Sequence, residues 1–160
     1  MRANDIQIGR VYHDGKVGLR QVVAIEGAPI RVRYRILSAK TEREFDIFGK
    51  EVPLVGTERC VTLSAFAAWA KASYDEQEAA RILLRLKAAK IKLSPGEAAY
   101  LASVRAETLG APINAGTLVS YDHTEGRAVA GLEKKEMVRR VGSGEVEVLA
   151  LGAARINSAP

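Results

Sequence analysis

Apolar and polar side chains alternate in short runs over the first sixty residues, and glycine-containing turns separate the runs. A period of two residues is typical of strands that bury one face of a sheet. It is clearest at residues 30–37, where the even positions are apolar and positions 31, 33 and 35 are arginines. The strands that this pattern predicts are Ile8–Tyr12, Arg20–Ile25, Ile30–Leu37, Glu44–Phe48 and Cys60–Leu63. Five short strands indicate a small antiparallel β module, which we expect to form an SH3-like barrel.

The following residues are rich in Ala, Leu, Glu and Lys, a composition that favours helices. Thr62 or Ser64 is expected to cap a first helix that carries Phe66 and Trp69 on one face. A second helix is expected at residues 75–92, because acidic side chains lie in its first turn and lysines lie near its end, as the helix macrodipole favours. These two helices are expected to connect the β module to the rest of the chain.

The strongest local signal marks the start of a third helix. The run Ser94-Pro95-Gly96-Glu97 combines an N-cap serine, a proline at the first helical position and a glutamate that can close a capping box. The helix is expected to run to about Leu109, because Gly110 and Pro112 follow it and end helices in this way.

From Leu93 to about residue 152, the order of predicted elements resembles a winged helix-turn-helix domain of the kind found in bacterial transcriptional regulators. The helix that begins after Ser94 looks like the family's first helix, and residues 112–119 look like a short second helix. The most specific similarity is the run Leu-Glu-Lys-Lys-Glu-Met-Val-Arg-Arg at 132–140, which resembles the end of the recognition helix and the start of the wing. The wing would then consist of residues 138–141, a turn at 142–144, and residues 145–151.

The resemblance implies DNA contacts from the third helix of that domain, which would begin at Asp122 or Thr124, and from the wing. In such domains the recognition helix enters the major groove while the wing touches the flanking backbone. The positions that match are His123, Thr124, Arg127, Arg139 and Arg140. Among them, Arg127 is the expected base reader.

Two positions depart from the family pattern. Glu136 stands where the family has a glycine, so we expect either a left-handed backbone or a different helix end there. Glu125 stands where the family has an apolar residue, and Glu133 adds a third carboxylate to the helix that would approach phosphates. These acids support an alternative in which Glu125, Glu133 and Glu136 contact a partner protein.

Composition places the chain among folded proteins. Its 160 residues are 48% hydrophobic and 27% charged, which suffices for a packed interior and excludes a disordered chain. No apolar run approaches the roughly 18 residues of a membrane span, and the N-terminal residues do not resemble a signal peptide. We therefore expect a soluble, cytoplasmic protein without a membrane partner. The single cysteine, Cys60, excludes a disulfide framework and a multi-cysteine zinc site.

The net charge of +5 allows nucleic-acid binding without requiring it, and the positive excess lies entirely in residues 1–93. There Arg31, Arg33 and Arg35 share one face of a predicted strand at a spacing of about 6.5 to 7 Å, comparable to that of successive phosphates. They could follow a nucleic-acid backbone. The alternative is a solvated strand face whose arginines pair with acidic residues across the sheet. The acids considered are Glu42, Glu44 and Asp46, and the residues that could extend the basic row are Arg10, Lys16 and Arg20.

The predicted helix at 75–92 could add a second basic surface. Arg81 and Arg85 lie one turn apart, so they share a helical face. Ordinary solvation of an exposed helix accounts for the same pattern. Both interpretations stay open at this point.

Other chemistry finds little support in the sequence. His13 and His123 are the only histidines and fall in different predicted modules, and no phosphate loop, nucleophile elbow or dinucleotide fingerprint is present. Cys60 is expected to be a core thiol. The aromatic residues Tyr12, Tyr34, Phe45 and Phe48 are expected to pack in the core, with an aromatic binding pocket as the alternative. We therefore expect no enzyme activity, metal or cofactor.

The sequence as a whole predicts an α+β protein that binds rather than catalyses. The expected domains are a β module at 1–60, a helical connector at 61–93, a winged helix at 94–152 and a flexible tail at 153–160. The expected function is DNA binding in transcription regulation, and regulators of this type often form homodimers. The alternative is a protein-binding adaptor or inhibitor, encoded by a phage or mobile element, that acts on a partner protein.

Overall fold

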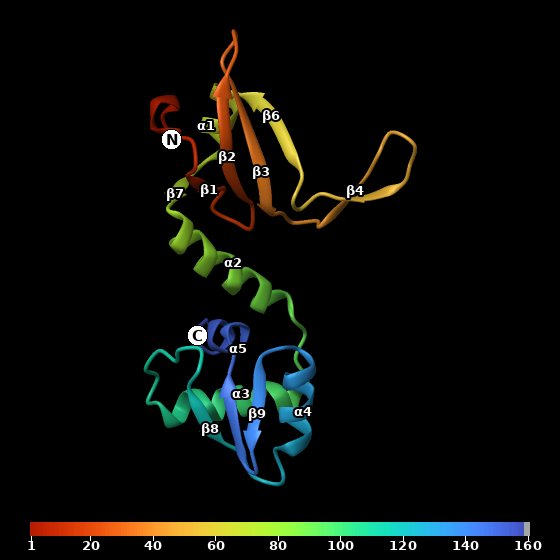
Figure 1. Cartoon of the computed structure of the whole chain (residues 1–160), viewed down its shortest axis with the longest axis vertical. Coiled ribbons are helices and arrows are strands. Elements are labelled where there is room, and N and C mark those ends of the chain that lie inside the picture. Colours follow the sequence, from red (N-terminus) through yellow and green to blue (C-terminus); the bar gives the residue numbers. More distant parts are fainter. Residues whose placement is uncertain (159–160) are drawn as a thin grey trace. The chain divides into compact units, whose positions relative to one another are not determined.

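The computed structural model describes residues 1–158 as two compact units, one formed by Met1–Leu83 and the other by the chain from Leu84 onward (Figure 1). Within the described residues the fold is mixed α+β, with an antiparallel five-stranded sheet and five α-helices. The expected fold class is therefore confirmed at this level. The boundary between the units falls inside helix α2, Glu76–Lys90.

The first unit is built on the five-stranded sheet. Its strand order is β6-β3-β2-β1-β7, and every neighbouring pair is antiparallel. The expected barrel is not formed, because the described strands make an open sheet whose edges β6 and β7 do not pair with each other. The strands are β1 Val11–His13, β2 Leu19–Glu26, β3 Arg31–Ser38, β6 Glu58–Thr62 and β7 Ala72–Tyr74.

Helix α1, Leu63–Trp69, covers the inner face of this sheet in place of barrel closure. The hydroxyl of Thr62 accepts a hydrogen bond from the amide of Ala65 and caps the helix, as expected. Phe66 is fully buried, and its ring meets Tyr12 edge-on at 5.5 Å between ring centroids. Residues of the expected connector are therefore part of the first unit, since α1 fills the core and β7 extends the sheet.

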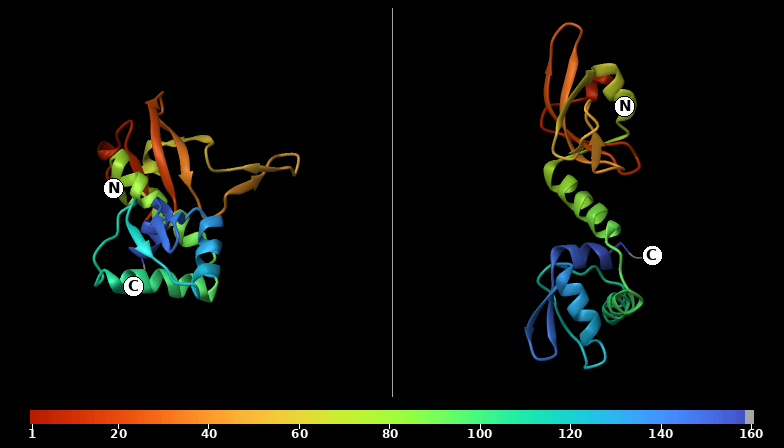
Figure 2. Two further views of the ribbon diagram at one scale, coloured as in Figure 1. Left: turned by 60° about the horizontal axis from the view of Figure 1, so that its bottom comes forward. Right: turned by 90° about the vertical axis from the view of Figure 1, so that its right-hand side faces the viewer.

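A two-stranded hairpin of β4, Arg43–Phe45, and β5, Glu51–Pro53, stands apart from the five-stranded sheet (Figures 1 and 2). The strand expected to reach Phe48 ends at Phe45, because the side chain of Asp46 accepts hydrogen bonds from the backbone amides of residues 48 and 50 and forms a turn. The expected burial of Phe45 and Phe48 is wrong: their side chains are 74% and 87% exposed.

The second unit places three helices around a three-stranded sheet with the order β8-β10-β9 (Figure 1). Helix α3 begins with the predicted capping box, in which Ser94 accepts from the amide of Glu97 and the Glu97 carboxylate accepts from the amide of Ser94. The elements are α3 Pro95–Glu107, β8 Leu118–Ser120, α4 Gly126–Lys134, β9 Val138–Gly142, β10 Glu145–Val148 and α5 Ala150–Ile156.

The short helix expected at 112–119 is absent, and strand β8 occupies part of that segment. Gly116 adopts a positive φ of 93°, and its amide donates to the carbonyl oxygen of Val148 on β10. The turn that it makes directs Leu118–Ser120 into antiparallel pairing with β10. The second unit therefore has one helix between β8 and β9, where a helix-turn-helix motif would need its second and third helices.

The expected flexible tail at 153–160 is wrong for residues 153–158, and residues 159–160 lie outside the described part of the chain. Ala153 and Ile156 of α5 are buried in the core of the second unit. The side-chain NH₂ group of Asn157 donates to the backbone carbonyl oxygen of Ile113 at 2.8 Å. The side-chain oxygen of Asn157 accepts from the backbone amide of Ile113 at 2.9 Å. Arg155 donates to two carbonyl oxygens at the end of α2. Sequence composition did not reveal these anchors.

Glu97 links the start of α3 to the end of α4. Its carboxylate is only 5% exposed and forms an ion pair with the ammonium group of Lys135. Burial alone would raise the pKa of Glu97, but the hydrogen bonds from Lys135 and Ser94 lower it overall. Gly131 lies directly beside this carboxylate, and a Cβ atom there would overlap it.

Glu136 has a positive φ of 55°, so of the two outcomes expected there the left-handed backbone is the one that the structure shows. The residue lies between the end of α4 and the buried Met137, which donates its amide to the carbonyl oxygen of Leu132. This sharp reversal leads the chain directly into β9. Separately, none of the helices in residues 1–158 is long and apolar enough to cross a membrane.

We expect Gly131→Ala to destabilise the protein by about 1 to 3 kcal/mol, although alanine favours helices, because the new methyl group displaces the buried carboxylate of Glu97. The matched control is Gly126→Ala in the same helix, where nothing lies within 4 Å of the added Cβ. Urea unfolding followed by circular dichroism measures both variants. Equal stability of the two variants would contradict the assigned packing.

Glu97→Gln should remove a pH-dependent part of the stability. Because the folded pKa of Glu97 lies below its ordinary value of 4.5, its contribution is present above that pH and is lost as the pH falls further. The difference in unfolding free energy between wild type and Glu97→Gln should therefore shrink between about pH 6 and pH 3. The exposed Glu107→Gln variant serves as control, and a constant difference for Glu97→Gln would refute the ion pair's role.

Candidate functional site

The outer face of β3 carries the predicted row of arginines. Its burial alternates residue by residue, so Val32, Tyr34 and Ile36 are buried while the side chains between them are exposed. The side chains of Arg33 and Arg35 are 47% and 49% exposed. The row therefore lies on one solvent-facing surface, together with the residues of β2 and β6 that pair with it.

Two glutamates balance part of this row. The carboxylate of Glu58 on β6 forms ion pairs with the guanidinium groups of Arg35, at 2.9 Å, and Arg33, at 3.6 Å. The carboxylate of Glu26 lies 3.9 Å from the guanidinium of Arg33. Arg31 forms no ion pair with any residue in 1–158. The acids considered from the sequence are placed otherwise: Glu44 pairs with Arg59, and Asp46 holds its own turn. Glu58 lies directly opposite Arg35 in the register of β3 and β6, whereas both ion pairs of Arg33 are diagonal to the register.

The three residues considered as extensions do not lengthen the row. Arg10 donates to the hydroxyl of Ser73 at 3.1 Å, and Lys16 lies in the loop between β1 and β2. Arg20 lies on the opposite, inner face of the sheet, because it pairs with Ile36 while its neighbour Gln21 pairs with Arg35. Arg81 and Arg85 are exposed on α2, one turn apart.

Cys60 is exposed rather than buried, so its assignment to the core is wrong. It pairs with Arg33 across the outer face, while the neighbouring Val61 packs against the core. Within residues 1–158, no three His, Cys, Asp or Glu side chains are grouped so that they could hold a metal ion.

The start of α4 is preceded by a tight turn that contains His123 and Thr124. The carboxylate of Asp122 accepts hydrogen bonds from the backbone amides of Thr124 and Glu125 and from the Thr124 hydroxyl. These hydrogen bonds, the Thr124 hydroxyl first, lower the pKa of Asp122. His123 and Thr124 are exposed, and Arg127 is exposed in the first turn of α4.

The hairpin of β9 and β10 brings Arg140 to this end of α4. Its guanidinium donates to the carbonyl oxygen of Gly126 at 3.0 Å and lies 5.9 Å from the centre of the Tyr121 ring. Arg140 is therefore fixed at the residue that precedes Arg127, and it also lies 3.9 Å from the Glu133 carboxylate. Arg139 instead forms an ion pair with Glu147 on the neighbouring strand.

The three acids of the alternative interpretation are used unequally. Glu125 accepts from the amide of Asp122 at 3.0 Å, and Glu133 accepts from the amide of Arg140 at 3.2 Å. Glu136 is exposed. Two of the three carboxylates therefore stabilise their own unit, which leaves little unpaired negative charge on α4 for a partner.

No protein-family model matches this chain, and comparison with characterised proteins and with solved structures finds no match either.

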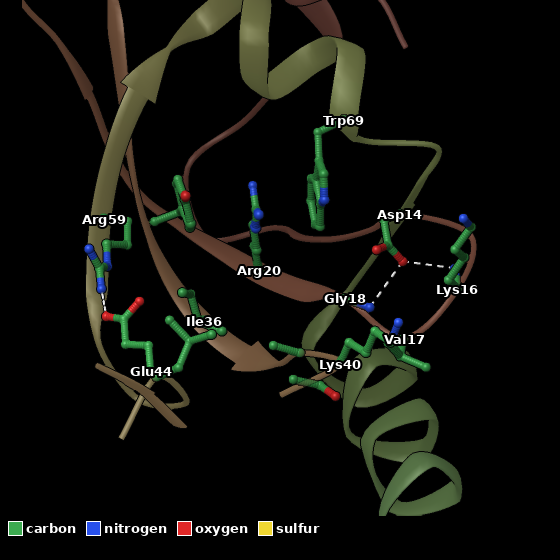
Figure 3. Close-up of a pocket in the computed structure, with 14 residues that line it drawn as sticks. Asp14, Lys16, Val17, Gly18, Arg20, Ile36, Lys40, Glu44, Arg59 and Trp69 are labelled. Atoms are coloured by element: carbon green, nitrogen blue, oxygen red, sulfur yellow. Dashed lines mark hydrogen bonds and ion pairs between the residues drawn. The ribbon is translucent and has the colours of Figure 1, made fainter. Parts of the chain in front are cut away.

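A cavity of about 450 Å³ opens on the inner side of the first unit, at the end of the sheet where the β1–β2 and β3–β4 loops meet (Figure 3). Sequence reasoning did not find this site. Its polar lining consists of Asp14, Lys16, Arg20, Ser38, Lys40, Glu44 and Arg59, and its apolar and aromatic lining includes Val17, Tyr34, Ile36, Leu54 and Trp69.

Arg20 is stacked between two aromatic rings at the centre of this cavity. Its guanidinium carbon lies 3.9 Å from the centre of the Trp69 ring and 4.6 Å from the centre of the Tyr34 ring. Burial lowers the pKa of Arg20, an effect that Tyr34 and Asp14 partly oppose. The clue in the sequence was a charged residue at an inward position of an alternating strand, two residues before the buried Val22.

The loop beside Arg20 is held by Asp14. The Asp14 carboxylate accepts from the amides of Lys16 at 2.8 Å and Gly18 at 3.0 Å (Figure 3). Burial alone would raise the pKa of Asp14, but these backbone hydrogen bonds lower it. Only glycine fits at position 18 without displacing its neighbours, because a Cβ atom there would lie 2.7 Å from the Asp14 carboxylate and 3.1 Å from the Trp69 ring. The loop therefore presses against Trp69 and fixes one wall of the cavity.

Proposed function

We propose that the chain is a non-enzymatic DNA-binding protein that acts in transcription regulation. The observation that carries this proposal is the exposed row of Arg31, Arg33 and Arg35 on β3. Alternate residues of a strand lie about 6.5 to 7 Å apart, which matches the spacing of phosphates along one strand of DNA. Glu58 and Glu26 form ion pairs with Arg33 and Arg35, but these two carboxylates do not neutralise the three positive charges of the row. Because these pairs are exposed to solvent, exchanging their carboxylates for phosphates requires little free energy.

The second unit would add base contacts in this proposal. A helix followed by a β-hairpin supports the resemblance to a winged helix, and the exposed first turn of that helix carries Arg127 and holds Arg140 through the carbonyl oxygen of Gly126. Arg127 would read bases while Arg140 contacts a phosphate. The missing helix at 112–119 removes one support that such domains use to seat the recognition helix, so the row on β3 is the primary contact.

A protein-binding role, in which the chain pairs with a second copy of itself, is the second candidate, and the β4–β5 hairpin favours it. Phe45, Ile47 and Phe48 are 74%, 92% and 87% exposed at its tip, and an isolated two-stranded hairpin gains little stability by itself. Large apolar side chains grouped on a projecting hairpin are typical of a contact with another protein. The partner that this candidate commits to is a second copy of the chain, bound tip to tip.

Replacing Arg31, Arg33 and Arg35 together by glutamine should weaken binding to a mixed-sequence 30-base-pair duplex by about tenfold or more near 100 mM salt, because three phosphate contacts are lost. The slope of log affinity against log salt should fall by about 2 to 3. Fluorescence anisotropy between about 50 and 300 mM salt measures both quantities.

The matched control changes the same net charge elsewhere on the first unit, at the exposed Arg2, Lys50 and Lys71. Its salt slope should stay close to that of wild type. Equal loss of affinity in the two triple variants would show that only net charge matters. Absence of wild-type binding at the lowest salt would refute the DNA-binding proposal.

The adaptor candidate predicts self-association through the hairpin tip. Sedimentation velocity should show an average mass above the 17.3 kDa of the monomer as the concentration rises from about 5 to 200 μM. Phe45→Ser combined with Phe48→Ser should keep the protein monomeric over this range. The control pair Leu109→Ser and Leu118→Ser removes exposed apolar side chains elsewhere and should leave association unchanged. A monomeric wild type at all concentrations contradicts this candidate.

A further inference from the structure

The N–H groups of the Arg20 guanidinium donate a hydrogen bond to no residue in 1–158. Both of its faces are covered by aromatic rings, so only the edge of the group, which bears the N–H donors, can meet a ligand. An arginine usually directs this edge at a carboxylate, a phosphate or carbonyl oxygens. Neither carboxylate of the cavity fills this role, since Glu44 pairs with Arg59 and Asp14 accepts from loop amides.

The stack also prepares the guanidinium for binding. Trp69 and Tyr34 fix the plane of the group, so little rotational freedom remains to be lost when an anion arrives. The walls formed by Val17, Ile36 and Leu54 are apolar and strengthen electrostatic attraction near them. An arginine held in this way serves an oxyanion better than a freely moving surface lysine does.

The charges of the lining favour a dianion. Four cationic side chains and two carboxylates line the cavity, which leaves an excess of two positive charges. Lys16 and Lys40 form no ion pair within residues 1–158. Both line the rim of the cavity, while Arg20 lies between the aromatic rings of Trp69 and Tyr34 (Figure 3). A carboxylate ligand would carry one negative charge, whereas a phosphate monoester carries about 1.5 to 2 near pH 7.

We propose that this cavity binds a phosphate group, with Arg20 donating through its edge and Lys16 and Lys40 contributing from the rim. The volume of about 450 Å³ suits a ligand of the size of a pyrophosphate or a nucleotide. Because Arg20 occupies the facing sides of Trp69 and Tyr34, the phosphate is recognised rather than a stacked base. The site is separate from the arginine row, which lies on the opposite face of β3.

Trp69 is the only tryptophan and touches Arg20, so its fluorescence reports binding directly. Titration of inorganic pyrophosphate at constant ionic strength should give a saturable change in fluorescence with a dissociation constant below about 1 mM, whereas acetate should give none. The absence of a saturable change up to about 20 mM pyrophosphate, or an equal response to acetate, would overturn the proposal.

Arg20→Lys keeps the charge but loses the planar fork, so pyrophosphate affinity should fall by about tenfold or more. The matched control, Arg2→Lys, makes the same change at an exposed position outside both proposed sites and should bind pyrophosphate like wild type. Equal affinities of these two variants would overturn the proposal. Should Arg20→Lys lower stability, Lys40→Gln provides an independent test, because Lys40 is exposed and its loss should weaken binding by about threefold without altering the urea midpoint.

Competition with duplex DNA identifies the source of the phosphate. If pyrophosphate displaces DNA and Arg20→Lys weakens both ligands, the group belongs to a nucleic-acid backbone. If DNA binding is unaffected by either change, the group belongs to a small molecule. Both results retain the phosphate site, because the pyrophosphate titration measures that site whether or not the protein binds DNA.

Discussion

The strict alternation of β3 is the constraint on which both proposed sites depend. Every second side chain of this strand enters the core beside Phe66, so the intervening arginines face solvent. The same alternation places Tyr34 and Ile36 on the wall of the cavity. A slip of one residue in register would bury three guanidinium groups and expose the aromatic ring that stacks on Arg20, so packing of the core also fixes the position of the charges.

Local signals in the sequence predicted the elements whose stability is itself local. The alternation of β3, the cap at Thr62 and the capping box at Ser94 each depend on residues within a few positions of one another. The left-handed backbone at Glu136 was one of the two outcomes that the family resemblance implied there, the other being a different helix end. Such features depend on neighbouring residues in the chain, so they can be predicted without knowing which distant helix or strand packs against them.

Features that depend on distant residues escaped prediction. The resemblance to the winged-helix family implied a helix at residues 112–119, yet pairing with β10 places the end of this segment in strand β8. The tail is short and weakly amphipathic, yet Asn157 fastens it to the backbone of Ile113. Arg20 was considered as an extension of the outer row because of its charge, whereas strand register and two aromatic rings place it on the inner face. In each case a contact between residues far apart in the chain overrides the local preference.

The two groups of arginines differ in how easily their positive charge can be used. Arg33 and Arg35 face carboxylates that remain in solvent, where ion pairs are weak and a phosphate can replace them with little penalty. Arg20 faces no acceptor within residues 1–158 and is partly desolvated, so an anion there would gain more from each hydrogen bond than it would on the surface. A surface row of this kind suits many successive weak contacts with a polymer, whereas the enclosed guanidinium suits one well-placed phosphate. The fold therefore presents the same chemical group in two environments, and the environment decides which ligand each can bind.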